Sequence, residues 1–484
     1  MAAQNTSIKK SIFIVAIEKS SMIIFQFVTT VILARLLTPT DYGIVAMLTI
    51  FMTLSTTIID SGFGGSLVFY KDVTKKDYNT VFWVNILLGI FLYVLLFLSG
   101  DFISKFYSTP ILSQIIKILG FTIIFNSLGA IQFTILYKNL QFKKIAYISV
   151  ISYAVSAIIA IILAMLNYGL WALICQQVLY SVIKTLILFT TNKFIPDLSF
   201  SISLLKKHWK FGNGLFFSTI LRIIYDNIYI QLIGKYFNVV EAGYYNQATK
   251  LKDIPTNLFC HTFDYSIFPI FSKYKDNFTF SEKYKNINNC FSFICVPFFF
   301  LLALESKTIV YIILGDKWIE CSYILSILAI GSIFYTLEIL NRSALKARGK
   351  TQLLFQIDLF KRILGIIIIF IFLIYLGLNG VLLSYCLNSI VGWMVNSFYL
   401  SRYCFYSFKN QMKDIIRLIV ITSIPFSTIL YYNLCNNEIN IIYSFIKVIL
   451  FILIYIIISY TIRDHSLLEL IRIVKKTLKP KLIN

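Results

Sequence analysis

Residues 363–375 read Ile-Leu-Gly-Ile-Ile-Ile-Ile-Phe-Ile-Phe-Leu-Ile-Tyr, and residues 448–460 read Val-Ile-Leu-Phe-Ile-Leu-Ile-Tyr-Ile-Ile-Ile-Ser-Tyr. Neither run alternates apolar and polar residues as the strands of a membrane β-barrel do. Similar apolar runs recur along the chain in blocks of about twenty residues, the length that a helix needs to cross a bilayer core. Because backbone polar groups need internal partners in lipid, the predicted fold class is an all-α polytopic membrane protein.

The composition of the whole chain agrees with this class. Of its 484 residues, 58% are hydrophobic and 14% are charged, and the mean hydropathy is +0.79. Soluble proteins average about 25% charged residues. The chain therefore has too little polar surface for a water-soluble enzyme.

Apolar runs separated by polar breaks predict about fourteen transmembrane helices. Their predicted ranges are 12–34, 43–66, 80–99, 111–134, 147–166, 169–191, 211–234, 247–272, 288–304, 320–344, 353–376, 379–400, 414–432 and 441–462. The eighth is the weakest, because residues 252–264 are too polar to face lipid. That stretch either lines a cavity or is not a full span.

The distribution of basic residues predicts the orientation of these helices. Cytoplasmic loops of membrane proteins collect Lys and Arg, and here every second loop, as well as both ends of the chain, is basic. The intervening loops hold only Arg35, Lys105, Lys235, Lys307 and Lys317. Both termini are therefore predicted to be cytoplasmic, and the first apolar run is predicted to be a membrane helix rather than a cleavable signal. The excess of 44 Lys and Arg over 22 Asp and Glu reflects topology, so no nucleic-acid partner is expected.

An internal repeat divides the chain. Residues 34–43 (Ala-Arg-Leu-Leu-Thr-Pro-Thr-Asp-Tyr-Gly) match residues 234–243 (Gly-Lys-Tyr-Phe-Asn-Val-Val-Glu-Ala-Gly). In both, a small residue and a basic residue end one predicted helix, and an acidic residue followed two positions later by glycine begins the next. A second similarity relates residues 169–175 to residues 380–386. Six helices is an even number, so the predicted six-helix lobes, 1–192 and 193–410, are parallel repeats related by a pseudo-twofold axis along the membrane normal. Residues 411–484 add helices thirteen and fourteen and a basic cytoplasmic tail.

Residues 31–47 and 59–64 resemble the opening of bacterial polysaccharide exporters of the Wzx type. These exporters belong to the multidrug/oligosaccharidyl-lipid/polysaccharide exporter superfamily. The resemblance continues through residues 241–248 and 344–350. It implies an inner-membrane flippase that moves undecaprenyl-pyrophosphate-linked oligosaccharide, for O-antigen and lipopolysaccharide, capsule or exopolysaccharide, from the cytoplasmic to the periplasmic leaflet. Expected partners are this lipid-linked substrate, membrane lipids, a coupling cation (H⁺ or Na⁺), and the polysaccharide polymerase and chain-length machinery.

Charges inside apolar spans are costly, so they mark the candidate functional residues. Candidate contacts to the pyrophosphate and sugar are Lys19, Arg222, Arg342, Lys361 and Arg362. Candidate coupling or gate residues are Asp60, Asp226, Asp264, Glu338 and Asp358. The basic excess of this set suits an anionic head group between two lobes.

Each of these assignments has a structural alternative. Arg222 and Asp226 are spaced i,i+4, so they either pair with each other or jointly face the cavity. Lys19 either supplies a second cation or extends to the cytoplasmic surface.

Glu338 with Arg342, and Asp358 with Arg362, repeat the i,i+4 spacing. They are either interhelical gate pairs, simple pairs, or substrate contacts. Asp60 precedes a glycine cluster that is either a hinge or gate or a site of tight helix packing.

The remaining reactive residues predict no catalytic, metal or cofactor site. The eight cysteines are scattered and the histidines His208, His261 and His465 lie far apart, so we expect packing roles. Lys117, Lys184 and Lys447 are expected to anchor helices at the lipid interface. Two other functions stay open: multidrug efflux on the same architecture, which favours an acidic cavity, and a membrane acyltransferase using His261.

Overall fold

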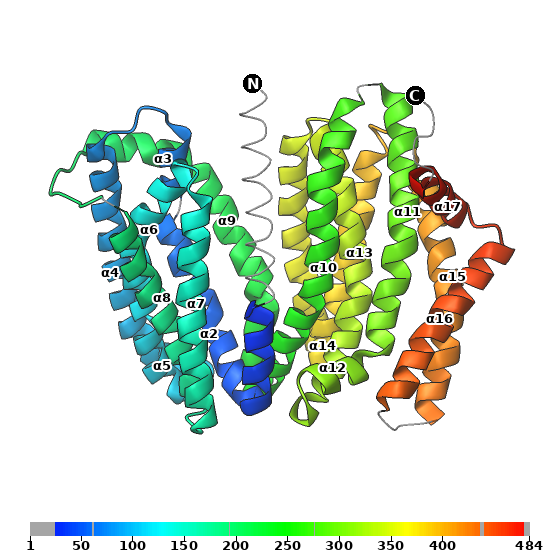
Figure 1. Cartoon of the computed structure of the whole chain (residues 1–484), viewed down its shortest axis with the longest axis horizontal. Coiled ribbons are helices and arrows are strands. Elements are labelled where there is room, and N and C mark those ends of the chain that lie inside the picture. The colour runs from blue at the N-terminus through cyan, green and yellow to red at the C-terminus, as the bar shows by residue number, and fades with distance from the viewer. Residues whose placement is uncertain (1–24, 61, 193, 275, 436–439, 479–484) are drawn as a thin grey trace. The chain divides into compact units, whose positions relative to one another are not determined.

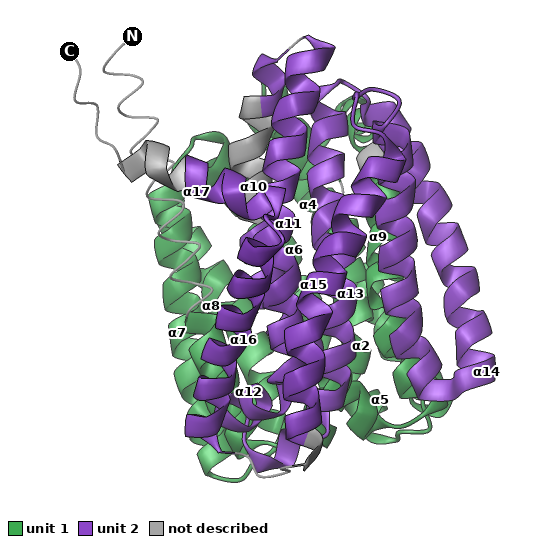
Figure 2. Ribbon diagram, turned by 90° about the vertical axis from the view of Figure 1, so that its right-hand side faces the viewer, with its two compact units in different colours: residues 1–246 green, residues 247–484 purple. Residues whose placement is uncertain are grey.

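The computed structural model describes residues 25–60, 62–192, 194–274, 276–435 and 440–478, with the side chains at 213–215, 261–270, 434–435 and 473–478 left undescribed. The chain divides into two compact units, residues 1–246 and 247–484. Within each unit the long helices run side by side (Figures 1 and 2).

Unit 1 is built entirely from helices over its described residues. A short helix, Phe25–Leu36, precedes α2 (Pro39–Asp60), α3 (Phe63–Phe69), α4 (Lys75–Phe106), α5 (Ile111–Leu119), α6 (Phe121–Lys138), α7 (Phe142–Met165), α8 (Leu170–Thr191) and α9 (Ile202–Tyr236). The helix α10 (Val239–Lys273) begins in unit 1 and continues into unit 2.

Unit 2 continues with α11 (Asn277–Leu304), α12 (Ser306–Ile313), a 3₁₀ turn (Asp316–Trp318), α13 (Cys321–Ala347), α14 (Thr351–Leu400), α15 (Phe408–Cys435), α16 (Ile441–Thr461) and α17 (His465–Leu478). Its core is rich in aromatic residues, among them the fully buried Trp393, Tyr284 and Phe299. Van der Waals packing of this kind, rather than the hydrophobic effect, holds helices together in lipid.

The predicted all-helical polytopic fold is confirmed, whereas the predicted count of fourteen spans is not. Ten helices of the described chain are long and apolar enough to cross a membrane. The long helices α9 and α10 are not among them, because polar residues interrupt both. The first predicted span, 12–34, lies largely outside the described residues.

The segment labelled α14 contains two of the predicted spans and is not one continuous helix. Gly377 interrupts it with non-helical backbone angles (φ 59°, ψ −135°), in the left-handed region that glycine tolerates. The two halves then pack together, since the Asn388 side chain donates to the Gly365 carbonyl at 3.4 Å. The predicted helices 353–376 and 379–400 are thus the two arms of a hairpin.

The repeated motifs at 34–43 and 234–243 are in mutual contact in unit 1. A methyl group added to Gly43 would collide with the Val239 carbonyl, and one added to Gly243 would collide with the Pro39 carbonyl. Both pairs are related by the same offset of 200 residues, so the contact is reciprocal in the manner of a local twofold axis. Close backbone approach of this kind requires glycine on both sides.

The same motifs begin α2 and α10 in equivalent ways. The Thr38 side chain and backbone amide both donate to Asp41, at 2.7 and 2.9 Å. In the second copy, the Asn238 side chain accepts a hydrogen bond from the Glu241 amide at 2.7 Å. Both arrangements satisfy amides that are left free in the first turn of a helix.

The connection from α8 to α9 is fixed to the start of α4. Asp197 forms an ion pair with Lys75 at 3.1 Å and accepts hydrogen bonds from the Ser199 hydroxyl and amide. These interactions, led by the Ser199 hydroxyl, lower the pKa of Asp197 to about 2. Nearby, Nε2 of the buried His208 on α9 lies 3.0 Å from Asp77 on α4.

The compact units differ from the lobes that the repeat predicts. The helix α9 packs against α2, α3 and α4 in unit 1, although the repeat assigns it to the second lobe. The lobe boundaries at 192 and 410 rest on helix correspondence rather than on compactness, and they stay a prediction. The C-terminal tail contains α17, which the sequence did not predict and which packs against α11.

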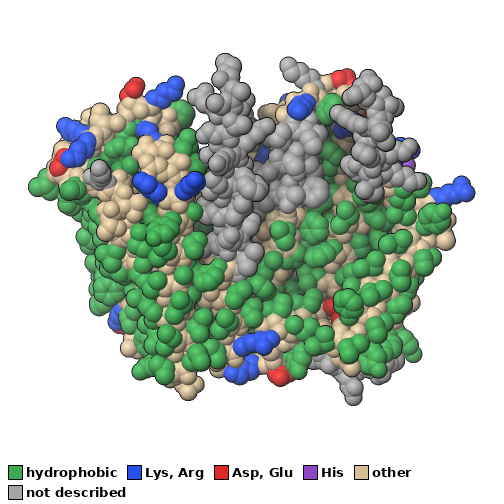
Figure 3. All heavy atoms as spheres, viewed as in Figure 1, with side chains coloured by type: hydrophobic (Ala, Val, Ile, Leu, Met, Phe, Trp, Pro, Cys, Tyr) green, Lys and Arg blue, Asp and Glu red, His purple; other side chains and the backbone are tan. Residues whose placement is uncertain are grey.

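The visible surface has the pattern of a membrane protein. Hydrophobic side chains cover the middle of the face in Figure 3, while Lys and Arg gather toward its upper and lower margins. Exposed apolar residues on α4 and α16, such as Leu98 (74%) and Ile442 (71%), would be unfavourable in water and suit lipid.

The reciprocal glycine contact yields a stability prediction. Gly43→Ala places a methyl group against a backbone carbonyl that has no rotamer to change, so we expect a loss of about 1–3 kcal/mol and a lower melting temperature of the purified protein. Gly243→Ala is expected to behave alike. The control is Gly65→Ala, where the added methyl meets nothing within 4 Å. It should leave stability unchanged or raise it by about 0.5–1 kcal/mol, and equal effects at Gly43 and Gly65 would contradict the contact.

Candidate functional site

Four charged side chains form a network between α13 and α14 in unit 2. Arg342 donates two hydrogen bonds to the carboxylate of Asp358, the longer at 2.9 Å. Lys361 pairs with Glu338, and Arg342 lies 3.7 Å from the same Glu338 carboxylate. Two cations thus balance two carboxylates inside membrane-spanning helices.

The second arm of α14 completes this network. The Asn396 side chain donates to Glu338 at 3.2 Å, and Gly392 leaves the space that the Glu338 carboxylate and the Lys361 ammonium occupy. Asn396 and Glu338 are buried. The network therefore joins α13 to both arms of the α14 hairpin.

The sequence singled out the four residues of this network but did not predict all of their pairing. It grouped Glu338 with Arg342 and Asp358 with Arg362 by i,i+4 spacing, whereas the shortest contacts cross from α13 to α14. This is the interhelical alternative stated above. Arg362 is half-buried and interacts electrostatically with Asp358. A gating or substrate-binding role for these residues stays a prediction.

The helices α2, α6 and α8 of unit 1 line an open cavity of about 500 Å³ with both polar and apolar side chains. Its wall includes Asp60 from α2, Asn126 from α6, and Gln177, Tyr180 and Lys184 from α8. Asp60 is exposed, so the cavity opens to the surface there. Asp60 and Lys184 interact electrostatically, but within the described residues they form no direct ion pair.

Lys184 corrects one expectation. It was predicted to anchor α8 at the lipid interface, yet it lines the cavity, with its ammonium 5.5 Å from the Phe133 ring centroid and 5.6 Å from that of Tyr180. A signal for this cavity was present in the sequence. Positions 177, 180, 181, 184 and 185 form a polar stripe at helical spacing on a mainly apolar helix.

The glycine cluster after Asp60 favours tight packing over a free hinge. Gly62 has a positive φ of 81°, and its α-carbon region abuts Gly212 of α9 so closely that neither accommodates a methyl group. Gate motion at this point is untested.

The remaining predicted residues are more dispersed. Arg222 and Asp226 are both exposed on α9. Lys19 lies outside the described residues, as do the side chains of Asp264 and His261 on α10.

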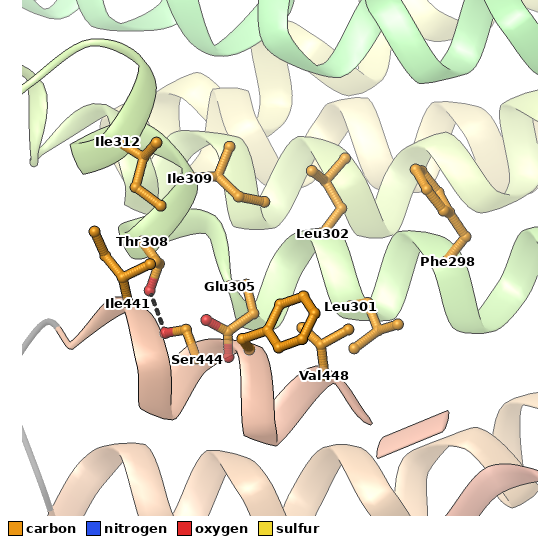
Figure 4. A pocket seen from close by; sticks show the side chains of 11 residues that line it. Phe298, Leu301, Leu302, Glu305, Thr308, Ile309, Ile312, Ile441, Ser444 and Val448 are labelled. Carbon is orange, nitrogen blue, oxygen red and sulfur yellow. Dashed lines mark hydrogen bonds between the residues drawn. The ribbon is translucent and has the colours of Figure 1, made fainter. Parts of the chain in front are cut away.

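A second pocket, of about 340 Å³, lies in unit 2 between α11, α12 and α16 (Figure 4). Its lining is apolar except for Glu305 and for Thr308 and Ser444, whose hydroxyls are 2.8 Å apart. Glu305 is buried, and its Oε1 atom has no hydrogen-bond partner among the described residues. Glu305 was not among the predicted site residues, because it lies just past the predicted helix 288–304.

No cluster of three or more His, Cys, Asp or Glu side chains that could hold a metal ion occurs in the described part of the chain. The charged groups described above can pair with each other, donate to phosphate or sugar oxygens, or carry a proton.

The α13–α14 network makes a prediction about packing. Gly392→Ala would displace the Glu338–Lys361 pair, since the new methyl group meets both side chains. The methyl group meets only the ends of these two flexible side chains, so the pair shifts but keeps both partners. We expect a loss of about 1–3 kcal/mol and a lower melting temperature. A melting temperature of Gly392→Ala that is equal to or above that of the control Gly65→Ala would show that the pair does not lie against this position.

The chain is similar to proteins of polysaccharide biosynthesis. A family model described as polysaccharide biosynthesis protein matches residues 32–323. The teichuronic acid biosynthesis protein TuaB of Bacillus subtilis is 27% identical over 71% of this chain and 72% of its own length. The lipopolysaccharide biosynthesis protein WzxC of Escherichia coli is 25% identical over 76% of this chain and 75% of its own length.

A solved structure shares the fold. The lipid II flippase MurJ, in an inward closed conformation, matches with a TM-score of 0.75 over 93% of this chain and 99% of that chain, at 18% identity. The predicted resemblance and the prediction of a membrane transport protein rather than an enzyme are confirmed. Because the family model covers more than half of the sequence, this chain belongs to the family of polysaccharide biosynthesis proteins.

Proposed function

We propose that this protein is a flippase that translocates undecaprenyl-pyrophosphate-linked oligosaccharide repeat units from the cytoplasmic to the periplasmic leaflet. The products would serve O-antigen, capsule or exopolysaccharide synthesis. The observation that carries the proposal is that a member of the polysaccharide biosynthesis family keeps its charged and polar clusters within its membrane helices. Charged and polar side chains within the membrane helices can bind a polar head group while it moves through the bilayer.

The proposed location is the bacterial cytoplasmic (inner) membrane, with both termini cytoplasmic. The alternation of basic and non-basic loops supports this orientation. Transport would follow alternating access, the mechanism associated with parallel helix repeats.

Arg222 is the proposed principal contact to the pyrophosphate. It is exposed on α9, and a guanidinium can bind phosphate oxygens bidentately. Lys19, Arg342, Lys361 and Arg362 are the further proposed contacts. Since Arg342 and Lys361 already pair with carboxylates, an anionic substrate would have to exchange with Asp358 and Glu338, which suits a gate.

Coupling to H⁺ or Na⁺ is proposed to use a carboxylate, with Asp226 and Asp264 as candidates and Asp60 as a gate residue. A coupling carboxylate is needed for transport but not for substrate binding. Asp226→Asn should therefore reduce transport and spare binding, and unchanged transport would remove it from this role.

The polyprenyl tail is proposed to lie against α15 and α16, which correspond to the predicted spans 414–432 and 441–462. The apolar pocket beside α16 supports this placement, because Phe298, Leu302 and Val448 offer a surface suited to an isoprenoid chain. The polymerase and chain-length machinery are the proposed downstream partners, since the exported repeat unit is their substrate.

The direct test is the leaflet location of lipid-linked oligosaccharide in a deletion strain, read with a glycan-modifying reagent that cannot cross the inner membrane. We expect the glycan to accumulate on the cytoplasmic side in the deletion strain. A plasmid copy of the gene should restore its exposure on the periplasmic side. Normal outside exposure in a strain without any second flippase would overturn the proposal and bring multidrug efflux forward.

The role of Arg222 is tested in the same assay. Arg222→Ala removes a charge-assisted contact worth about 1.5–3 kcal/mol, so we expect export to fall roughly tenfold or more, while Arg222→Lys retains part of it. Arg402→Ala, which removes an arginine stacked on Phe398 and Tyr399, is the control and should leave export unchanged. Full export by Arg222→Ala would refute this contact without refuting the flippase.

A further inference from the structure

We infer that the cavity between α2, α6 and α8 binds one uncharged sugar ring of the transported head group. The inference rests on the proposed function and adds a site to it. The cavity lies wholly within unit 1, and its volume of about 500 Å³ falls in the usual range of small-molecule sites, roughly 300–1,000 Å³.

The wall formed by α2 presents hydrogen-bond acceptors. Thr49, Thr53 and Thr56 donate their hydroxyl protons to carbonyls of their own helix at 3.2, 2.7 and 3.0 Å. A hydroxyl that has used its proton keeps two lone pairs. These threonines can therefore accept hydrogen bonds from the hydroxyl groups of a sugar.

The walls formed by α6 and α8 present donors. Within the described residues, the amides of Asn126 and Gln177 have no hydrogen-bond partner, and both line the cavity. The Lys184 ammonium contacts only aromatic rings there. Polar groups at membrane depth are costly without a partner, so their number in one cavity indicates that a polar ligand satisfies them.

Two aromatic rings complete the site. Phe133 and Tyr180 flank Lys184 on the cavity wall. Sugar rings have apolar C–H faces beside their hydroxyls, and an aromatic surface with a few placed polar groups is the usual lining of such a site. The cavity thus offers acceptors, donors and an apolar face to a single ligand.

The charge balance favours a neutral sugar. Lys184 and Asp60 interact electrostatically across the cavity and together carry no net charge. Both can form charge-assisted hydrogen bonds to hydroxyl groups. An acidic sugar would be attracted by Lys184 and repelled by Asp60, so it gains nothing over a neutral one.

The test uses the purified full-length protein in lipid nanodiscs and saturation-transfer NMR with two probes, methyl galactopyranoside and methyl glucuronide. The decisive variant is Gln177→Leu, which keeps the side-chain size and removes the amide. Its matched control is Gln176→Leu, because Gln176 is the neighbouring residue and bonds to Tyr153 at 3.4 Å instead of lining the cavity.

We expect the wild-type protein and Gln176→Leu to bind the galactoside equally. Gln177→Leu should weaken it about fivefold, and Asn126→Leu combined with Gln177→Leu more than tenfold, as one and two lost hydrogen bonds imply. Equal binding by Gln176→Leu and Gln177→Leu, tighter binding of the glucuronide, or no galactoside binding by the wild type would each overturn the inference.

The leaflet assay in the deletion strain distinguishes failure of the sugar site from failure of the proposed flippase function. Export by the wild-type gene combined with absence of sugar binding refutes the sugar site alone. Absence of any export role refutes the flippase, whatever the binding data show.

Discussion

The close backbone contact between the first turns of α2 and α10 is the constraint on which unit 1 depends. Gly43 and Gly243 each lie against a carbonyl of the other repeat, which fixes where α2 begins. That helix then forms one wall of the polar cavity and accepts, through the Met47 carbonyl, a hydrogen bond from Gln231 of α9. The position of α9, which carries Arg222, follows from the same contact.

The two polar clusters differ in how far the chain itself satisfies them. In unit 2, Arg342, Lys361, Asp358 and Glu338 neutralise one another and join α13 to α14. In unit 1, amide and charged groups line a cavity without bonding to each other. Lipid offers no hydrogen bonds. The charges of the first cluster are already paired, although the side-chain oxygen of the adjacent Asn396 has no hydrogen-bond partner among the described residues, and the second cluster is suited to a ligand. This contrast favours a gating role for the first cluster, whose cations reach a substrate only by exchange with Asp358 and Glu338, and a binding role for the second.

Most of the fold follows from the sequence, because apolar runs, basic loops and the 200-residue repeat are long-range patterns with few alternatives. The two motifs of the repeat are in contact through Gly43 and Gly243, whereas the division into two six-helix lobes stays a prediction. Pairing across helices was harder to foresee: i,i+4 spacing grouped Glu338 with Arg342, but the rotation of α13 against α14 decides that Lys361 reaches Glu338.

Lys184 was misjudged as an interface anchor, because a single lysine does not indicate a cavity unless Gln177 and Tyr180 on the same helix face are considered with it. Glu305 was missed because burial at a helix end depends on a distant helix, α16.

The most direct measurement of the central claim is translocation by the purified protein in proteoliposomes. Polyprenyl-pyrophosphate oligosaccharide would be placed in both leaflets and the outer-facing glycan modified by an impermeant reagent. If the protein is a flippase, vesicles that contain it will expose nearly all of the glycan over time, whereas protein-free vesicles will protect the inner half. Equal protection with and without the protein would rule out flippase activity.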